Sequence, residues 1–391
     1  MKPNAISAAI LLAMIPTTAS FAAGLDRSGQ SISAFLQPGN YAEASFSILD
    51  PKVSGKDITG RPVSDMAEDY YFPGAALKIQ ATDKISLGLI YDQPFGADST
   101  YAVEPSVFND GLQGTSVEVD TNNLTALIGY QPNQNWNIYA GPVWQTVAAE
   151  IRLRGQAYGN TGYNISVKQE EAYGWLAGFA YQIPEIALKA SLTYRSEISH
   201  KASTHETSNI ELPPNYLPQL PNGLAKQRID SADATTPQSV NLDFQTGVAA
   251  NTIAFANLRW VQWSQFAVKP TLLGDLSTLR GPKRQNLIDY SDDQWSATVG
   301  MGRKFNDKWS GSASVGYDSG AGNPVTTLGP VEGYWNVGLG AQFSPAEDYF
   351  IQAGVKYFWL GDAKAQTSGN VVGSFSDNTA IGYGMKIGYR F

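Results

Sequence analysis

The chain has 391 residues, no cysteine and a formal net charge of −8 at pH 7. Without cysteine it can form no disulfide, thiolate nucleophile or cysteine-ligated metal site, and its acidic balance lacks the basic footprint of a nucleic-acid-binding protein. Its mean hydropathy is slightly negative, although 43% of the residues are hydrophobic, as expected for strands that alternate between lipid-facing and lumen-facing side chains.

The N-terminus has the pattern of a secretory signal. A lysine at position 2 precedes an apolar run over residues 5–15, and a small-x-small cleavage site ends at Ala22. The apolar run is too short for a membrane-spanning helix. Residues 23–39 are polar and without periodicity, so they are either a disordered terminus or a short plug in a lumen. We expect a signal peptide over 1–22, a plug over 23–39 and a barrel over 40–391.

From residue 41 onward, runs with an alternating apolar and polar pattern recur between turn residues. A period of two places successive side chains on opposite faces of a strand. Short turns alternate with long polar loops, which is typical of bacterial outer-membrane barrels. The expected strands cover residues 41–49, 72–80, 85–91, 115–130, 136–154, 164–181, 186–201, 238–249, 253–268, 294–303, 308–317, 334–343, 349–360 and a final stretch that starts after 370.

The last residues, 381–391, show the pattern most clearly. Every odd position is large and apolar, and every even position is Gly, Lys or Arg. A barrel strand explains both faces, because the apolar side chains meet lipid and the small and basic ones meet a polar lumen. A last strand that ends on Phe391 also resembles the assembly signal of bacterial outer-membrane barrels.

The sequence therefore predicts an all-β fold: a transmembrane antiparallel β-barrel of about 14 strands with a short N-terminal plug. We expect a monomer in the bacterial outer membrane. Its expected partners are outer-membrane lipid, lipopolysaccharide and the barrel-assembly machinery.

Groups that could perform catalysis are few. The two histidines, His200 and His205, stand in no metal or triad motif and are interpreted as surface residues. No Gly-rich phosphate loop follows a strand and opens a helix. We expect no catalytic residue, no metal, no cofactor and no nucleic acid. An outer-membrane lipid-acting enzyme, which would need Ser and His paired in one site, is a less favoured alternative.

The predicted lumen face carries bases beside aromatic residues. Such charges can be structural ion pairs only, for example Arg195 with Glu197 on one strand face. As a set, however, they suit an amphiphilic anion, and Arg195 and Arg259 are the first choices for its carboxylate because a guanidinium can bind a carboxylate bidentately. The candidate lumenal residues are Arg195, Arg259, Lys189, Lys356, Phe255 and Trp263.

The predicted loop over residues 202–237 contains an apolar, proline-rich stretch. Leu212, Tyr216, Leu217 and Leu220 are the candidate external groove for a hydrophobic substrate. Packing of the loop on itself is an equally simple account.

Three segments resemble a known family. Residues 192–197 (Leu-Thr-Tyr-Arg-Ser-Glu), 263–266 (Trp-Ser-Gln-Phe) and 48–55 (Ile-Leu-Asp-Pro-Lys-Val-Ser-Gly) are similar to sequence marks of the FadL/TodX outer-membrane transporters of long-chain fatty acids and hydrocarbons. The resemblance implies a lumen closed by an N-terminal hatch, an outer apolar groove and a lumenal pocket. The family's hatch is longer and usually carries Asn-Pro-Ala, for which residues 37–39 (Gln-Pro-Gly) are the nearest match.

The resemblance also implies an inward kink of the third strand that opens the wall sideways. Here Pro94 cannot donate to the ladder and Gly96 permits a bend, although the bend could simply start the next loop. The expected function is a passive channel for long-chain fatty acids or related hydrophobic compounds, with lateral exit. A general polar-solute porin is the alternative.

Overall fold

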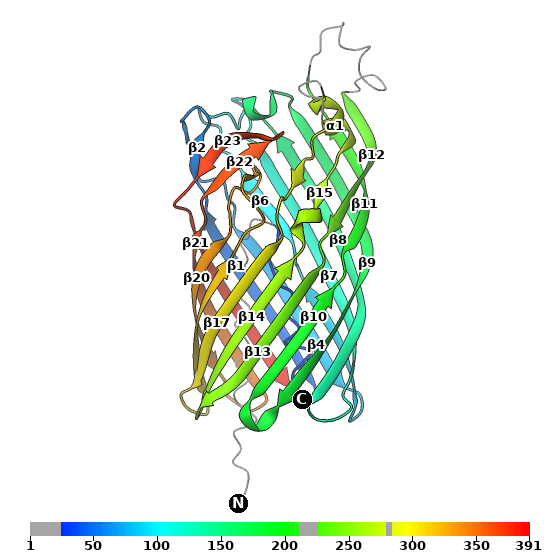
Figure 1. Cartoon of the computed structure of the whole chain (residues 1–391), viewed down its shortest axis with the longest axis vertical. Coiled ribbons are helices and arrows are strands. Elements are labelled where there is room, and N and C mark those ends of the chain that lie inside the picture. The colour runs from blue at the N-terminus through cyan, green and yellow to red at the C-terminus, as the bar shows by residue number, and fades with distance from the viewer. Residues whose placement is uncertain (1–24, 211–225, 279–283) are drawn as a thin grey trace, which may run out of the picture.

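The computed structural model describes residues 25–210, 226–278 and 284–391, so the predicted signal peptide lies outside the described residues. One antiparallel sheet dominates the structure, and its first strand, β1 (Tyr41–Lys52), pairs with both β4 (Tyr70–Gln80) and the last strand, β24 (Thr379–Arg390). Because the first strand pairs with the last, the sheet closes into the barrel drawn upright in Figure 1. The predicted fold class is confirmed.

The barrel wall has 14 strands. The sheet contains 17 segments, but three wall strands are each interrupted once. The breaks separate β5 (Ile85–Asp92) from β6 (Gly96–Thr100), β10 (Leu188–Arg195) from β11 (Ile198–Thr207), and β12 (Gln227–Thr236) from β13 (Ser239–Ala249). The other wall strands are β7 (Ser116–Tyr130), β8 (Trp136–Leu153), β9 (Tyr163–Ile183), β14 (Thr252–Val261), β17 (Gln294–Lys304), β18 (Trp309–Asp318), β20 (Tyr334–Phe343) and β21 (Tyr349–Leu360).

Short turns close the lower end of the barrel in Figure 1, and long connections cover the upper end. Long loops face the cell exterior in bacterial barrels, so the upper end is the outer one. Among the described residues, no helix is long and apolar enough to cross a membrane. The smaller elements are β2 (Gly55–Asp57), β3 (Pro62–Val63), β15 (Ala267–Val268), β16 (Ile288–Asp289), β19 (Val325–Thr326), β22 (Ala363–Thr367), β23 (Asn370–Phe375), α1 (Thr271–Ser277) and the 3-10 turns η1 (Gln156–Tyr158), η2 (Pro184–Ile186) and η4 (Trp263–Gln265).

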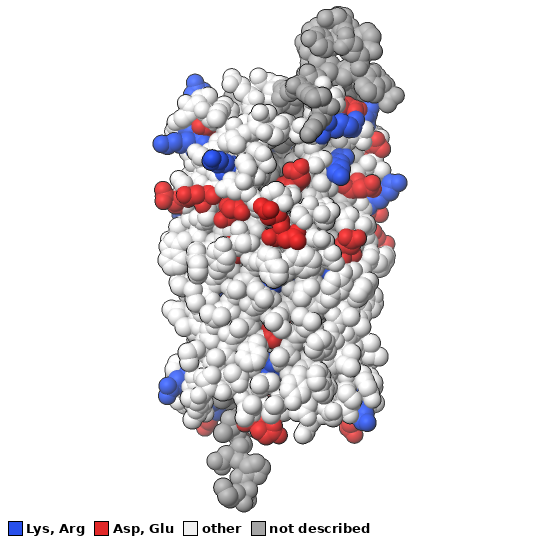
Figure 2. Space-filling model, in the orientation of Figure 1, with Lys and Arg blue, Asp and Glu red and all other residues white. Residues whose placement is uncertain are grey.

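The alternation in the sequence separates outer from inner side chains as predicted. On β24, Tyr383, Met385 and Ile387 are exposed on the outer surface, whereas Ala380 and Lys386 are buried inside. Figure 2 shows that nearly all charged side chains on the visible face lie above or below a broad uncharged belt. An apolar belt between two charged margins is the outer surface that a membrane-spanning barrel requires.

One predicted strand and one predicted loop differ from the structure. Instead of a strand over 186–201 and a loop over 202–237, the chain breaks after Arg195, and β11 and β12 pair as an extended hairpin. These two strands stand beyond the uncharged belt and carry polar residues on both faces, so no apolar alternation reveals them. Glu197 falls in the break and is exposed, so it does not share the lumen face of Arg195. The surface interpretation of His200 is wrong, because this residue points inward and is only 2% exposed.

Two apolar clusters fill parts of the barrel. Residues 25–40, called the N-terminal segment below, contribute Ile32, Phe35 and Leu36 to a cluster with inward residues of β7, β8 and β9. The Phe35 ring meets the Tyr139 ring edge-on with centroids 5.8 Å apart. A larger cluster forms the outer part of the core beneath the loops. The N-terminal segment therefore packs against one side of the lumen and leaves the other side open.

Candidate functional site

The open side of the lumen is a cavity of about 170 Å³. Its wall changes in character from one end to the other. β13, β14, β17, β18 and β20 contribute mainly hydroxyl and amide side chains, with Phe255 and Leu339 among them. β4 and β5 contribute Phe72, Ala76, Ile90 and Tyr91 beside Asp92, and this part of the wall is called the apolar end below. A cavity with a polar end and an apolar end can hold an amphiphile in one orientation.

Arg259 lines this cavity but already has partners within the chain. Its Nε forms an ion pair with Asp26 Oδ2 at 2.7 Å, and both side chains are almost completely buried. Its terminal nitrogens donate to Asn241 Oδ1 at 2.7 Å and to Gln30 Oε1 at 3.1 Å. Asp26 and Gln30 belong to the N-terminal segment, so Arg259 fastens that segment to β14.

Arg195 and Lys189 contact the same segment. Arg195 donates to the carbonyl oxygen of Gln30, and Lys189 Nζ donates to the carbonyl oxygen of Leu36 at 2.8 Å. Neither base lines the cavity. A backbone carbonyl carries only a partial charge, so a substrate carboxylate could compete for these donors only by displacing the N-terminal segment.

The remaining lumenal candidates lie in two different places. Lys356 and Phe255 line the cavity. Trp263 lies in the outer apolar cluster, is completely buried, and donates from its indole nitrogen to Gln294 Oε1 at 2.6 Å. Its ring meets the Phe95 ring edge-on at 5.5 Å between centroids. Trp263 therefore helps to close the outer end of the lumen.

The barrel wall is interrupted beside the apolar end of the cavity. β4 pairs with β5 only over residues 75–80, while its outer part, from Tyr70 to Gly74, pairs with β1 alone. β6 pairs only with β7, apart from an isolated bridge between Ala67 and Ser99. The hydrogen-bonded ladder between β4 and the β5–β6 strand is therefore missing on the outer side of Ala75, along residues 70–74 of β4. We call this interruption the wall break.

The strand turns inward at the wall break and meets the N-terminal segment. Pro94 and Gly96 are both buried. The backbone nitrogen of Arg27 donates to the carbonyl oxygen of Pro94 at 2.6 Å, and the backbone nitrogen of Gly96 donates to that of Leu25 at 2.8 Å. Ser28 Oγ donates to Asp92 Oδ2 at 2.6 Å. The segment thus replaces part of the missing ladder.

Gly96 leaves room for a neighbouring side chain. Its backbone is not among the positive-φ positions, so it needs no special freedom to bend. A Cβ at this position would lie 2.2 Å from Cζ of Arg27. The guanidinium occupies that space and stacks 4.2 Å from the Tyr70 ring centroid. The missing side chain of Gly96 makes room for this cation–π contact.

The candidate external groove residues, Leu212, Tyr216, Leu217 and Leu220, lie outside the described residues. No sequence pattern indicated the role of Glu206, on β11. Its carboxylate accepts hydrogen bonds from the backbone nitrogens of residues 271–273 at 3.1, 3.2 and 3.1 Å. A carboxylate at a helix start satisfies otherwise unpaired backbone donors, so Glu206 fixes α1 over β11 and β12.

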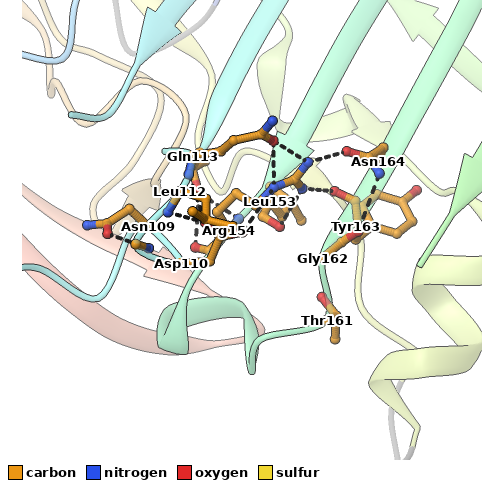
Figure 3. A network of polar contacts seen from close by, with 12 residues as sticks. Asn109, Asp110, Leu112, Gln113, Leu153, Arg154, Thr161, Gly162, Tyr163 and Asn164 are labelled. Carbon is orange, nitrogen blue, oxygen red and sulfur yellow. Dashed lines mark hydrogen bonds and ion pairs between the residues drawn. The ribbon is translucent and has the colours of Figure 1, made fainter. Parts of the chain in front are cut away.

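A second polar network orders the outer loops next to Glu206, whose carboxylate also accepts from the Tyr163 hydroxyl at 2.8 Å (Figure 3). Arg154 is 7% exposed and donates to Gln113 Oε1 at 3.0 Å, Asn164 Oδ1 at 2.6 Å and the carbonyl oxygen of Tyr163 at 3.0 Å. Asp110 Oδ2 lies 3.6 Å from its Nε. One arginine therefore joins the loop before β7 to the loop between β8 and β9.

Solved structures share this architecture at low sequence identity. A FadL homologue from Pseudomonas aeruginosa superposes with a TM-score of 0.74 at 17% identity, covering 96% of this chain and 98% of that chain. The toluene transporter TodX from P. putida gives 0.63 at 14% identity, with 97% and 93% covered. The toluene transporter TbuX from Ralstonia pickettii gives 0.60 at 11% identity, with 92% and 91% covered. No curated protein matches the sequence.

The sequence itself matches a family model. The model describes outer membrane protein transport proteins (OMPP1/FadL/TodX) and covers residues 31–391, which include the whole barrel and most of the N-terminal segment. The resemblance drawn from three short motifs is thereby confirmed, as is the outer-membrane location. The chain belongs to the OMPP1/FadL/TodX family of outer-membrane transport proteins.

Proposed function

We propose that this protein is a passive outer-membrane channel for long-chain fatty acids or related hydrophobic compounds. Membership of a transport family and a fold shared with two transporters of toluene support a hydrophobic substrate. The observation that carries the proposal is the cavity whose apolar end reaches the wall break. A lateral opening into lipid would serve a hydrophobic solute and not a polar one.

In this proposal the substrate follows a route with three stages. It is captured at the outer loops, where Leu212, Tyr216, Leu217 and Leu220 are the proposed groove. It then occupies the lumenal cavity, where Arg259, Lys356 and Phe255 contact it directly, and Arg195, Lys189 and Trp263 act through the N-terminal segment and the outer cluster. It leaves sideways through the wall break near Pro94 and Gly96. The N-terminal segment serves as the plug that blocks a straight path to the periplasm.

Lateral exit can be tested by stapling the wall break at both margins. Ala75 pairs with Tyr91 below it, and Ala67 bridges Ser99 above it. Cα atoms of antiparallel partners lie about 4.5–5.5 Å apart, within the range that a disulfide spans. Because the chain has no cysteine, a variant with cysteines at these four positions should form only the designed disulfides. A matched control places one pair at Met301 and Ala313, partners between β17 and β18.

The readout is uptake of radiolabelled hexadecanoate and toluene by cells that express the protein in their outer membrane. The oxidised quadruple variant should lose most of its uptake and recover it when reduced, whereas the control pair should transport in both states. Uptake that is unaffected by the staples would exclude the lateral route. Rapid liposome swelling in small sugars, without effect of fatty acid, would instead favour a general porin, and hydrolysis of lipid esters would favour an enzyme.

A further inference from the structure

Two neighbouring wall strands are interrupted at the same height. β10 and β11 are separated at residues 196–197, and β12 and β13 at residues 237–238. Beyond these breaks the hairpin of β11 and β12 stands above the uncharged belt (Figure 1). At the breaks the outer surface of the wall has an open notch, and its sides include Tyr173, Trp175, Tyr194, Ser196, Glu197 and Gln238. We call it the wall notch.

The wall notch is separate from the lumen. Ile198 belongs to the apolar cluster inside the barrel, and a Cβ at Gly174 would lie 2.6 Å from its Cγ1. The isoleucine therefore fills the space behind Gly174 and closes the notch on its inner side. A molecule in the notch comes from the membrane or from the water outside the barrel, and not from the channel.

Three aromatic rings stand around the wall notch. Tyr173 and Trp175 lie on the outer face of β9 and are 67% and 52% exposed. The Tyr194 ring, on β10, lies 5.2 Å from the Trp175 ring between centroids, at an angle of 50°. The face of an aromatic ring attracts a cation, and sets of rings around one space recognise alkylammonium groups.

The charge in the wall notch has the sign that suits a cation. Glu197 is exposed and has no hydrogen-bond or ion-pair partner in the described chain. None of the described residues that line the notch is basic. A carboxylate beside aromatic faces favours an ammonium over a neutral hydroxyl or an anion.

Hydrogen bonds hold the rim of the wall notch in place. Tyr194 Oη donates to Gln238 Oε1 at 2.6 Å, and Gln238 Nε2 donates to Gln262 Oε1 at 2.5 Å. The backbone nitrogen of Trp175 donates to Ser196 Oγ at 3.0 Å, and that of Ser196 donates to the Trp175 carbonyl oxygen at 2.9 Å. A rim that is ordered before binding loses little freedom when a ligand arrives.

We propose that the wall notch binds the ammonium of an ethanolamine-headgroup lipid of the outer membrane. The ammonium lies among Tyr173, Trp175 and Tyr194 and pairs with Glu197, while the acyl chains lie along the uncharged belt. The position favours a lipid over a soluble amine, because Trp and Tyr at the edge of a membrane protein sit at the level of the headgroups. This site is independent of the channel and of its substrate.

The test measures which lipid stays bound to the full-length protein, by native mass spectrometry after release from nanodiscs. The nanodiscs contain equal amounts of phosphatidylethanolamine and phosphatidylglycerol with the same acyl chains, and the wild-type protein should retain the ethanolamine lipid preferentially. Glu197→Gln and Trp175→Leu should each reduce this preference about twofold to fivefold, the range for one exposed ion pair or cation–π contact. Two controls should keep it: Glu150→Gln, an exposed carboxylate on β8, and Trp359→Leu, which removes one ring of the Tyr357–Trp359 pair on β21.

Several outcomes would overturn the site. A wild-type protein that retains both lipids equally would do so, as would an equal loss of preference in the control variants. Soluble phosphoethanolamine that binds as tightly as the lipid would overturn the assignment to a membrane lipid. Uptake of hexadecanoate should be the same in Glu197→Gln as in the wild type, and a loss of uptake would show that the notch is not separate from the channel. Heat-modifiable migration of each variant on a gel establishes that it has folded before lipids are compared.

Discussion

At the scale of single residues, a buried ion pair connects the N-terminal segment to the barrel wall. Asp26 and Arg259 are 1% and 3% exposed and 2.7 Å apart. A buried ion pair adds little net stability, but removal of one partner leaves an uncompensated charge and typically costs about 3–5 kcal/mol. Residue identity at these positions therefore controls whether the N-terminal segment stays in the lumen.

Substitution of Arg259 should release the N-terminal segment. Arg259→Ala strands Asp26 without its ion-pair partner, so residues 25–39 should exchange their amide hydrogens faster and small sugars should permeate liposomes more quickly. The double variant Asp26→Ala/Arg259→Ala removes both charges and should exchange more slowly than the single variant. Exchange followed by mass spectrometry checks this, and equal behaviour of the two variants would mean that the ion pair does not hold the segment.

Glu332, in the loop before β20, should make the outer loops pH-dependent. Burial raises the pKa of Glu332 to about 7, and its Oε2 is buried without a partner among the described residues. An exposed Glu titrates near a pKa of about 4.3. Between these values the folded loop binds the proton more tightly than the unfolded one, so its stability falls as pH rises from about 4.3 to about 7.

Glu332→Gln should remove this pH dependence, because the amide stays neutral at every pH. It also keeps an oxygen that can accept from the backbone nitrogen of Gly322, which donates to Glu332 Oε1 at 3.1 Å in the wild-type protein. Amide exchange of residues 319–333, corrected for the intrinsic effect of pH, should then be as slow at pH 8 as at pH 5. Glu347→Gln, in the turn at the opposite end of the barrel, is the control. A wild-type loop that is equally protected at both pH values would contradict the expectation.

At the scale of elements, β24 shows what can be predicted from the alternation of apolar and small or polar residues alone. Its outer and inner residues follow the sequence pattern along the whole strand, because lipid and lumen select opposite side chains. The hairpin of β11 and β12 was not predicted, because both of its faces carry polar residues and the strands therefore show no apolar alternation. Pro94 indicated the position of the break after Asp92, because proline has no backbone N–H to donate to a ladder. Its inward course depends on contacts with Leu25 and Arg27, which no local pattern encodes.

Deletion of the last residue tests the terminal strand. The Phe391 ring stacks on Tyr389 with centroids 5.6 Å apart and is 54% exposed on the outer surface. Without it, insertion into the outer membrane should fall, since the expected assembly signal is lost while the β1–β24 ladder keeps its pairs. The measure is the fraction of heat-modifiable barrel in outer-membrane preparations, with Phe391→Tyr as the conservative control. Normal insertion of the deletion variant would contradict the assembly role.

At the scale of the whole molecule, the lumen is divided lengthwise. The N-terminal segment packs its apolar side chains against β7 to β9 and turns its serines towards the cavity. The basic residues that face the lumen could be predicted from the sequence, but their partners could not. Asp26 and Gln30 lie more than 160 residues from the arginines that they meet, and only the closed barrel brings them together. Of the four basic candidates in the sequence, Lys356 differs in having no hydrogen-bond or ion-pair partner among the described residues.

The pairing of β1 with β24 also constrains the order in which the molecule is made. The N-terminal segment leads directly into β1 and lies within the wall, so the first part of the chain is enclosed only when the last strand arrives. Either the contact between Asp26 and Arg259 forms while the sheet is still an open ribbon, or the segment must later be threaded into a finished cylinder. The open ribbon needs no threading, and pairing of β24 with β1 would then enclose the segment.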